Sequence, residues 1–134
     1  MTLFKKLFAP KEIRAALGVL DELESRFDCD AFRIVRQSVE QMILARSQEF
    51  VEVIRKGTPA RKWILGAVSN FSGDHAESGQ YHLYRGVLDP LGLGQDFIKI
   101  YDGTIDESVR MGFLEKEFAE KQKAGLRQNI ENVG

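Results

Sequence analysis

The chain has 134 residues, of which 43% are hydrophobic and 29% charged, and its formal net charge is −1. A chain of this length forms one domain with a real core, and its composition excludes an intrinsically disordered protein. The near-neutral charge gives no support to nucleic-acid binding. No apolar run approaches the ~20 residues of a membrane-spanning helix. Cys29 is the only cysteine and cannot form an internal disulfide, so we expect a cytoplasmic protein.

The N-terminal segment MTLFKKLFAP is the most unusual part of the chain, because large apolar residues gather on one face of it, opposite Lys5 and Lys6. We expect residues 1–9 to be an apolar arm that packs on the domain or on a second subunit, since such a face left in water would be adhesive. Alternatively, residues 3–8 anchor the protein weakly to an anionic membrane surface. The apolar residues of the arm are Leu3, Phe4, Leu7 and Phe8.

Two helices are predicted from apolar residues at three- and four-residue steps. Pro10 suits the first turn of a helix whose apolar residues run from Ile13 to Phe27. The segment from Ala31 to Arg55 contains no Pro or Gly, so we expect one long central helix there. Polar residues 46–49 interrupt its apolar pattern, and at that point the helix either bends, lies partly exposed or holds a polar contact.

A third helix is predicted after the junction RKGTP, in which Gly57 ends one helix and Pro59 begins the next. We expect this helix to pack on the first two, because its apolar residues follow one face. Those residues are Ala60, Trp63, Ile64, Ala67, Val68 and Phe71. The small and polar residues 72–79 then predict a connection that leaves the helix.

Two later segments, residues 81–88 and 96–102, fit either a helix or a strand. We favour helices for both, followed by a charged covering helix over residues 115–132. The predicted fold is therefore all-α: residues 1–134 form a single compact bundle of five or six helices. The alternative is an α+β fold in which residues 81–88 and 96–102 form a small hairpin.

The stretch SGDHAESGQYHLYRG, residues 72–86, contains both histidines of the chain. A catalytic site here would use a histidine as the general base, orient it with an acid, and stabilise a developing negative charge with Tyr84 or Arg85. No nucleophile motif accompanies these residues, so we prefer a protein without catalytic activity. The catalytic candidates are Asp74, His75, Glu77 and His82.

A metal site is not expected in this stretch. His75 and His82 are seven residues apart, which places them about 10 Å apart along a continuous helix, too far to share an ion. No HExxH motif and no second cysteine are present. We therefore expect no metal or other cofactor, and we expect the two histidines to belong to different structural units.

Tyr81, Tyr84 and Arg85 are candidates for a recognition surface, because tyrosine and arginine dominate binding hot spots. The alternative places the two tyrosine rings in the core, with their hydroxyls reaching water.

We therefore expect a small helical protein that binds a protein partner or itself, as a homo-oligomer. The competing hypothesis is a small enzyme or ligand-binding protein. It would be centred on Asp74, His75, His82, Tyr84 and Arg85. A third hypothesis is a peripheral membrane protein anchored by residues 3–8.

Overall fold

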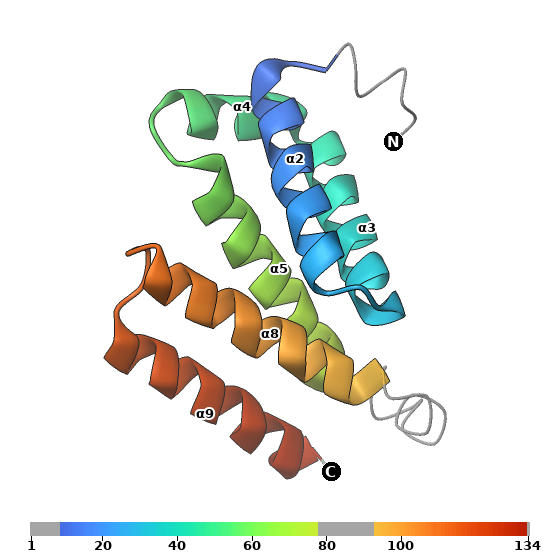
Figure 1. Ribbon diagram of the computed structural model, residues 1–134, viewed down its shortest axis with the longest axis vertical. Helices are drawn as coiled ribbons and strands as arrows, with labels where there is room; N and C mark the ends of the chain where they lie inside the picture. Colours follow the sequence, from blue (N-terminus) through green and yellow to red (C-terminus); the bar gives the residue numbers. More distant parts are fainter. Residues whose placement is uncertain (1–8, 78–92, 134) are drawn as a thin grey trace.

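The computed structural model describes residues 9–77 and 93–133 of the chain, with side chains up to residue 131. These residues form helices and contain no strand, which confirms the predicted all-α bundle (Figure 1). The hairpin alternative is wrong, because residues 96–102 are helical; its other half, residues 81–88, lies outside the described residues. The helices are α2 (Lys11–Arg26), α3 (Asp30–Ala45), α4 (Ser47–Arg55), α5 (Ala60–Glu77), α8 (Leu93–Arg110) and α9 (Lys116–Val133).

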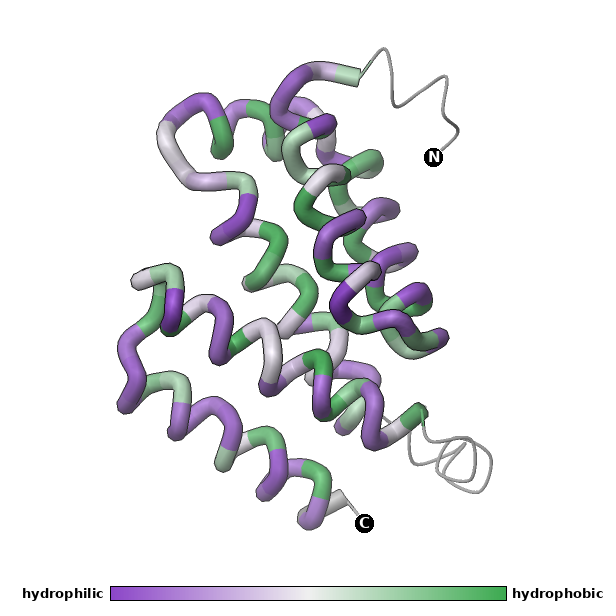
Figure 2. The backbone as a smooth tube through the Cα atoms, in the orientation of Figure 1, coloured by the Kyte–Doolittle hydropathy of each residue, from purple (hydrophilic) through white to green (hydrophobic). Residues whose placement is uncertain are grey.

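The central helix of the bundle is α5, which contacts α2, α3, α8 and α9. Each helix alternates between hydrophobic and hydrophilic residues along its length, as amphipathic helices do (Figure 2). The apolar faces meet in one core to which the helices from α2 to α9 all contribute. Its largest fully buried apolar side chains are Phe32, Leu17, Leu20, Ile43, Ile64, Leu65 and Ile100.

The predicted long helix over residues 31–55 is wrong in its extent, because the chain breaks between α3 and α4. Arg46 leaves the helical conformation, with φ −133° and ψ 47°. From there α4 runs across the end of the α2–α3 pair instead of continuing α3 (Figure 1). The break turns Phe50 into the core, where its ring meets the edge of Trp63 at a centroid distance of 4.8 Å. Burial of Phe50 against the partly buried Trp63 favours the change of direction over a continuous helix.

The prediction of a connection at residues 72–79 is also wrong for residues 72–77, which extend α5. Ser72 is fully buried, and its hydroxyl donates to the carbonyls of Val68 and Ser69, so its polar group is satisfied inside the helix. Gly73 faces Tyr101 of α8, and a Cβ there would lie only 3.1 Å from the ring. Packing against α8 therefore overrides the turn preference of these small residues.

Two helical glycines are expected to respond in opposite ways to alanine. A Cβ at Gly103 would lie 2.6 Å from a Phe27 ring atom, whereas a Cβ at Gly66 meets nothing within 4 Å. Gly66→Ala is expected to raise the free energy of unfolding by about 0.5–1 kcal/mol through helix propensity. Gly103→Ala is expected to lower the free energy of unfolding by about 1 kcal/mol net, because the clash with Phe27 outweighs the gain in helix propensity. Urea denaturation measures both changes. If Gly103→Ala instead stabilised the protein, the Phe27 ring would have moved aside at little energetic cost.

Candidate functional site

The catalytic candidates on α5 do not form one site. Asp74 and Glu77 both line a polar cleft, whereas His75 is not among its lining residues. The His75 ring instead stacks on Phe97 of α8, with centroids 5.0 Å apart and an interplanar angle of 19°. Burial lowers the pKa of His75, and the charge of Asp74 only partly opposes this shift. His75 therefore belongs to the packing between α5 and α8.

The other candidates from the sequence lie outside the described residues. This applies to His82 and to the proposed recognition residues Tyr81, Tyr84 and Arg85. It applies also to the apolar residues of the N-terminal arm, which are Leu3, Phe4, Leu7 and Phe8. Whether His75 and His82 share a site stays a prediction.

The polar cleft lies where α5, α8 and α9 meet and has a volume of about 250 Å³. Asp74 and Glu77 line it from α5, Tyr101 from α8, and Gln122 and Asn129 from α9. The two acids are three residues apart, so they share one face of α5. A short sequence motif could not reveal this site, because its walls come from segments far apart in the chain.

Tyr101 is held in place as one wall of the cleft. Its hydroxyl donates to the backbone carbonyl of Gln122 at 3.2 Å, and its ring lies against Gly73. Burial raises the pKa of Tyr101, and the negative charges of Glu77 and Asp102 raise it further. The positive charge of Arg127 partly opposes this shift.

A second hollow, called here the α2–α4 groove, lies between the start of α2 and one face of α4. Its volume is about 550 Å³. Pro10, Ile13 and Val51 line it with apolar surface, and the exposed Glu49 and Glu52 line it with negative charge. Arg55 also lines it, and its positive charge is paired with Glu12. The groove therefore combines an apolar surface with acidic groups, a combination that suits a basic amphipathic segment.

Beside this groove lies Glu12, a carboxylate that is only 4% exposed. Its Oε1 accepts a hydrogen bond at 3.0 Å from Nε of Arg55, which itself lines the groove. Its Oε2 is buried and accepts no hydrogen bond from the described residues. Hydrogen bonding from its own backbone amide and from Arg55 lowers the pKa of Glu12, so the group is charged at neutral pH. No sequence pattern singles out Glu12, because an acid in a first helical turn is common.

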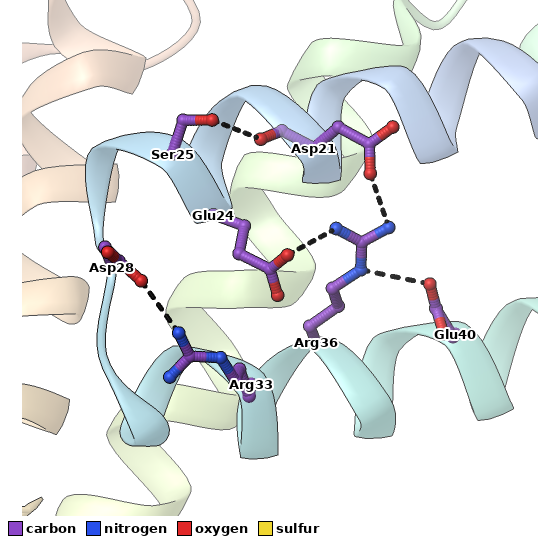
Figure 3. Close-up of polar contacts among 7 residues, drawn as sticks. All are labelled: Asp21, Glu24, Ser25, Asp28, Arg33, Arg36 and Glu40. Carbon is purple, nitrogen blue, oxygen red and sulfur yellow. Dashed lines mark hydrogen bonds and ion pairs between the residues drawn. The ribbon is translucent and has the colours of Figure 1, made fainter.

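Other charged residues form networks that connect the helices. Arg36 of α3 donates to Asp21 at 2.7 Å and Glu24 at 3.5 Å, both on α2, and to Glu40 at 3.1 Å on its own helix (Figure 3). Its side chain is only 16% exposed, and the three acids balance its charge. This network ties α2 to α3, and we assign it a structural role.

The described residues offer no metal site, since no group of three or more histidine, cysteine or acidic side chains gathers among them. Within the same residues, no helix has both the length and the hydropathy needed to cross a bilayer. Comparison of the chain with protein-family models, curated proteins and solved structures found no match. The function is therefore argued from the geometry of the α2–α4 groove.

Proposed function

We propose that this protein is a self-association module in which residues 3–8 of the N-terminal arm of one copy dock in the α2–α4 groove of a second copy. The observation that carries the proposal is the buried Oε2 of Glu12, which lacks a donor from the described residues. A buried acceptor without a partner costs about 1–3 kcal/mol, so a donor that reaches it stabilises the assembly. The two lysines of the arm supply such donors.

The arm and the groove are chemically complementary. The four large apolar side chains of the arm match the apolar surface made by Pro10, Ile13 and Val51. Lys5 and Lys6 match the negative charges on the groove. Fully burying one Leu or Phe side chain is worth about 1.5–3 kcal/mol, so apolar contact provides most of the affinity and charge provides orientation.

The position of the groove supports exchange of arms between two copies. The arm joins the domain at Ala9, next to Pro10, which lines the groove. A two-fold axis near this junction would bring the arm of each copy to the groove of the other and would give a closed, symmetric dimer. As a helix, six arm residues extend about 9 Å, and α4 with nine residues extends about 13 Å, so the lengths are compatible.

The phenylalanines of the arms contribute most of the area that the proposed dimer buries. Each Phe buries about 150–250 Å², so the two phenylalanines of each of two arms contribute about 600–1,000 Å². A cytoplasmic location remains part of this proposal and is consistent with the free thiol of Cys29.

Charge reversal on either side of the contact is expected to weaken the dimer at least tenfold. Lys5→Glu with Lys6→Glu places negative charge against an acidic groove, and Glu49→Lys with Glu52→Lys removes the attraction from the other side. The groove substitutions spare the described core, since Glu49 and Glu52 are exposed. Light scattering of the full chain over a range of concentrations measures the dissociation constant.

A matched control is the pair Lys116→Glu and Lys121→Glu, which reverses two exposed lysines of α9. Helix α9 packs on α5 and α8, away from the groove, so these changes are expected to leave the dimer intact. A wild-type protein that stays monomeric at every concentration, or a control that dissociates like the groove variant, would argue against the proposal. A monomer that sediments with anionic vesicles would instead favour the membrane hypothesis.

A further inference from the structure

We propose that two copies of this chain can exchange halves at Arg46, where α3 and α4 join into one continuous helix in each copy. The first half of one copy, α2 and α3, then packs on the second half of the other, α5, α8 and α9. This is a domain swap, in which contacts within a chain are replaced by the same contacts between chains. It uses the core and not the N-terminal arm, so it does not rest on the proposed function.

The break between α3 and α4 consists of Arg46 alone, and no residue there requires it. Arg46 is neither glycine nor proline, and its side chain makes no capping hydrogen bond to α4. Its amide donates to Met42 at 3.3 Å, and the amide of Phe50 donates to Arg46 at 3.0 Å. A helical Arg46 would also pair backbone groups that the two helix ends leave without helical partners. Local structure therefore favours a continuous helix.

The apolar face of α3 continues into α4 in register. Val39 and Ile43 are buried on α3, and Phe50 and Ile54 follow Ile43 by seven and eleven residues. In a continuous helix, side chains at these spacings lie on one face. In the exchanged dimer, this face of each continuous helix is available to pack on the same face of the other, because a two-fold interface is self-complementary.

The contacts that close the monomer join the two halves of the chain. Helices α2 and α3 contact α5, and α3 also contacts α8. Arg26 of α2 donates to Glu107 of α8 at 2.9 Å, and Gly103 of α8 faces the ring of Phe27, the residue that follows α2. In the exchanged dimer these contacts form between copies, so the exchange preserves the core.

The two forms therefore differ mainly at α4. Within this helix, all of which the structure describes, Phe50 alone is buried, and joining α4 to α3 removes its contact with Trp63. Beside this contact lies a hollow of about 140 Å³, so packing at the break is incomplete. The same movement separates Arg55 from Glu12 and removes the α2–α4 groove. Exchange of halves and exchange of arms are therefore mutually exclusive.

The test compares Arg46→Ala with Arg46→Gly, both in the chain that carries Lys5→Glu and Lys6→Glu, in which arm exchange is disabled. Alanine favours a helical residue 46 about fivefold more than glycine, which raises the association constant of a dimer with two such residues about 25-fold. Each protein is refolded slowly from urea at several concentrations, and size-exclusion chromatography measures the dimer fraction. The Arg46 side chain is 74% exposed, so both variants are expected to fold.

The matched control is Gly66→Ala in the same arm-reversed chain. It raises helix propensity within α5, where a Cβ meets nothing within 4 Å, and is expected to leave the dimer fraction unchanged. In a dimer made from equal amounts of ¹³C-labelled and unlabelled chains, nuclear Overhauser effects between Phe27 and Gly103 are expected to be intermolecular.

Equal association constants for the two Arg46 variants would overturn the proposal. It would also be overturned by the absence of any dimer, or by a dimer in which Phe27 and Gly103 stay in contact within one chain. Arm exchange is already disabled in these chains, so each of these outcomes bears on the exchange of halves alone.

Discussion

Replacing Phe32 with alanine is expected to lower the free energy of unfolding by about 3–5 kcal/mol. The side chain is 0% exposed and is the largest of the fully buried ones among the described residues. Its ring stacks on Phe27, the residue that follows α2, at a centroid distance of 6.0 Å, so its removal leaves a cavity in the core beside this ring. Urea denaturation followed by circular dichroism measures the loss.

Two further variants make this result interpretable. Ile34→Ala on the same helix removes a side chain that is 39% exposed, and we expect a loss below about 1 kcal/mol. Phe32→Leu keeps part of the side-chain volume and is expected to lower the free energy of unfolding by about 1–2 kcal/mol. This variant therefore still measures the contribution of position 32 if the alanine variant does not fold. Similar losses for Phe32→Ala and Ile34→Ala would mean that Phe32 is not a core residue.

Glu107 is expected to stabilise the fold in a pH-dependent way. This buried carboxylate of α8 accepts hydrogen bonds from Arg110 and, at 2.9 Å, from Arg26 of α2. The bond from Arg110, followed by that from Arg26, lowers the pKa of Glu107 despite its burial. A carboxylate whose pKa is lowered by folding contributes stability above its unfolded pKa of about 4.3, and this contribution is lost as the pH falls.

Glu107→Gln is expected to lower the free energy of unfolding at pH 7 by about 1.5–3 kcal/mol, the range for hydrogen bonds to charged groups. The difference in the free energy of unfolding between the variant and the wild type should shrink at pH 3. At that pH the wild-type carboxyl approaches protonation and, like the glutamine, loses its charge. Urea denaturation at both pH values measures it. A difference that stays constant with pH would show that the charge of Glu107 contributes nothing.

Much of the fold could be predicted because most helices carry an uninterrupted apolar stripe. The residues from Ile13 to Phe27 predict α2, and the regular spacing from Ala60 to Phe71 predicts most of α5. The break at Arg46 could not be placed, because polar residues 46–49 suit a bend, an exposed turn or a polar contact equally. Its cause is the tertiary contact between Phe50 and Trp63, which no local pattern contains.

The sites were less predictable than the fold for the same reason. The sequence offers Asp74 and Glu77 as candidates, but Tyr101, which lines the same cleft, comes from α8 and carries no local signal. Gly73 predicted a turn, although its role is to let the Tyr101 ring approach α5. The unpartnered oxygen of Glu12 depends on how α2 meets α4, which only the folded structure reveals.

The central claim, that two copies exchange their N-terminal arms, is tested most directly by mixing complementary variants. The chain with Lys5→Glu and Lys6→Glu keeps a native groove, and the chain with Glu49→Lys and Glu52→Lys carries a basic one. Each is expected to be mainly monomeric alone in sedimentation velocity. Mixed in equal amounts, they are expected to form a heterodimer, because the acidic arm of the first now suits the basic groove of the second. A mixture that sediments as two monomers would contradict arm exchange between copies.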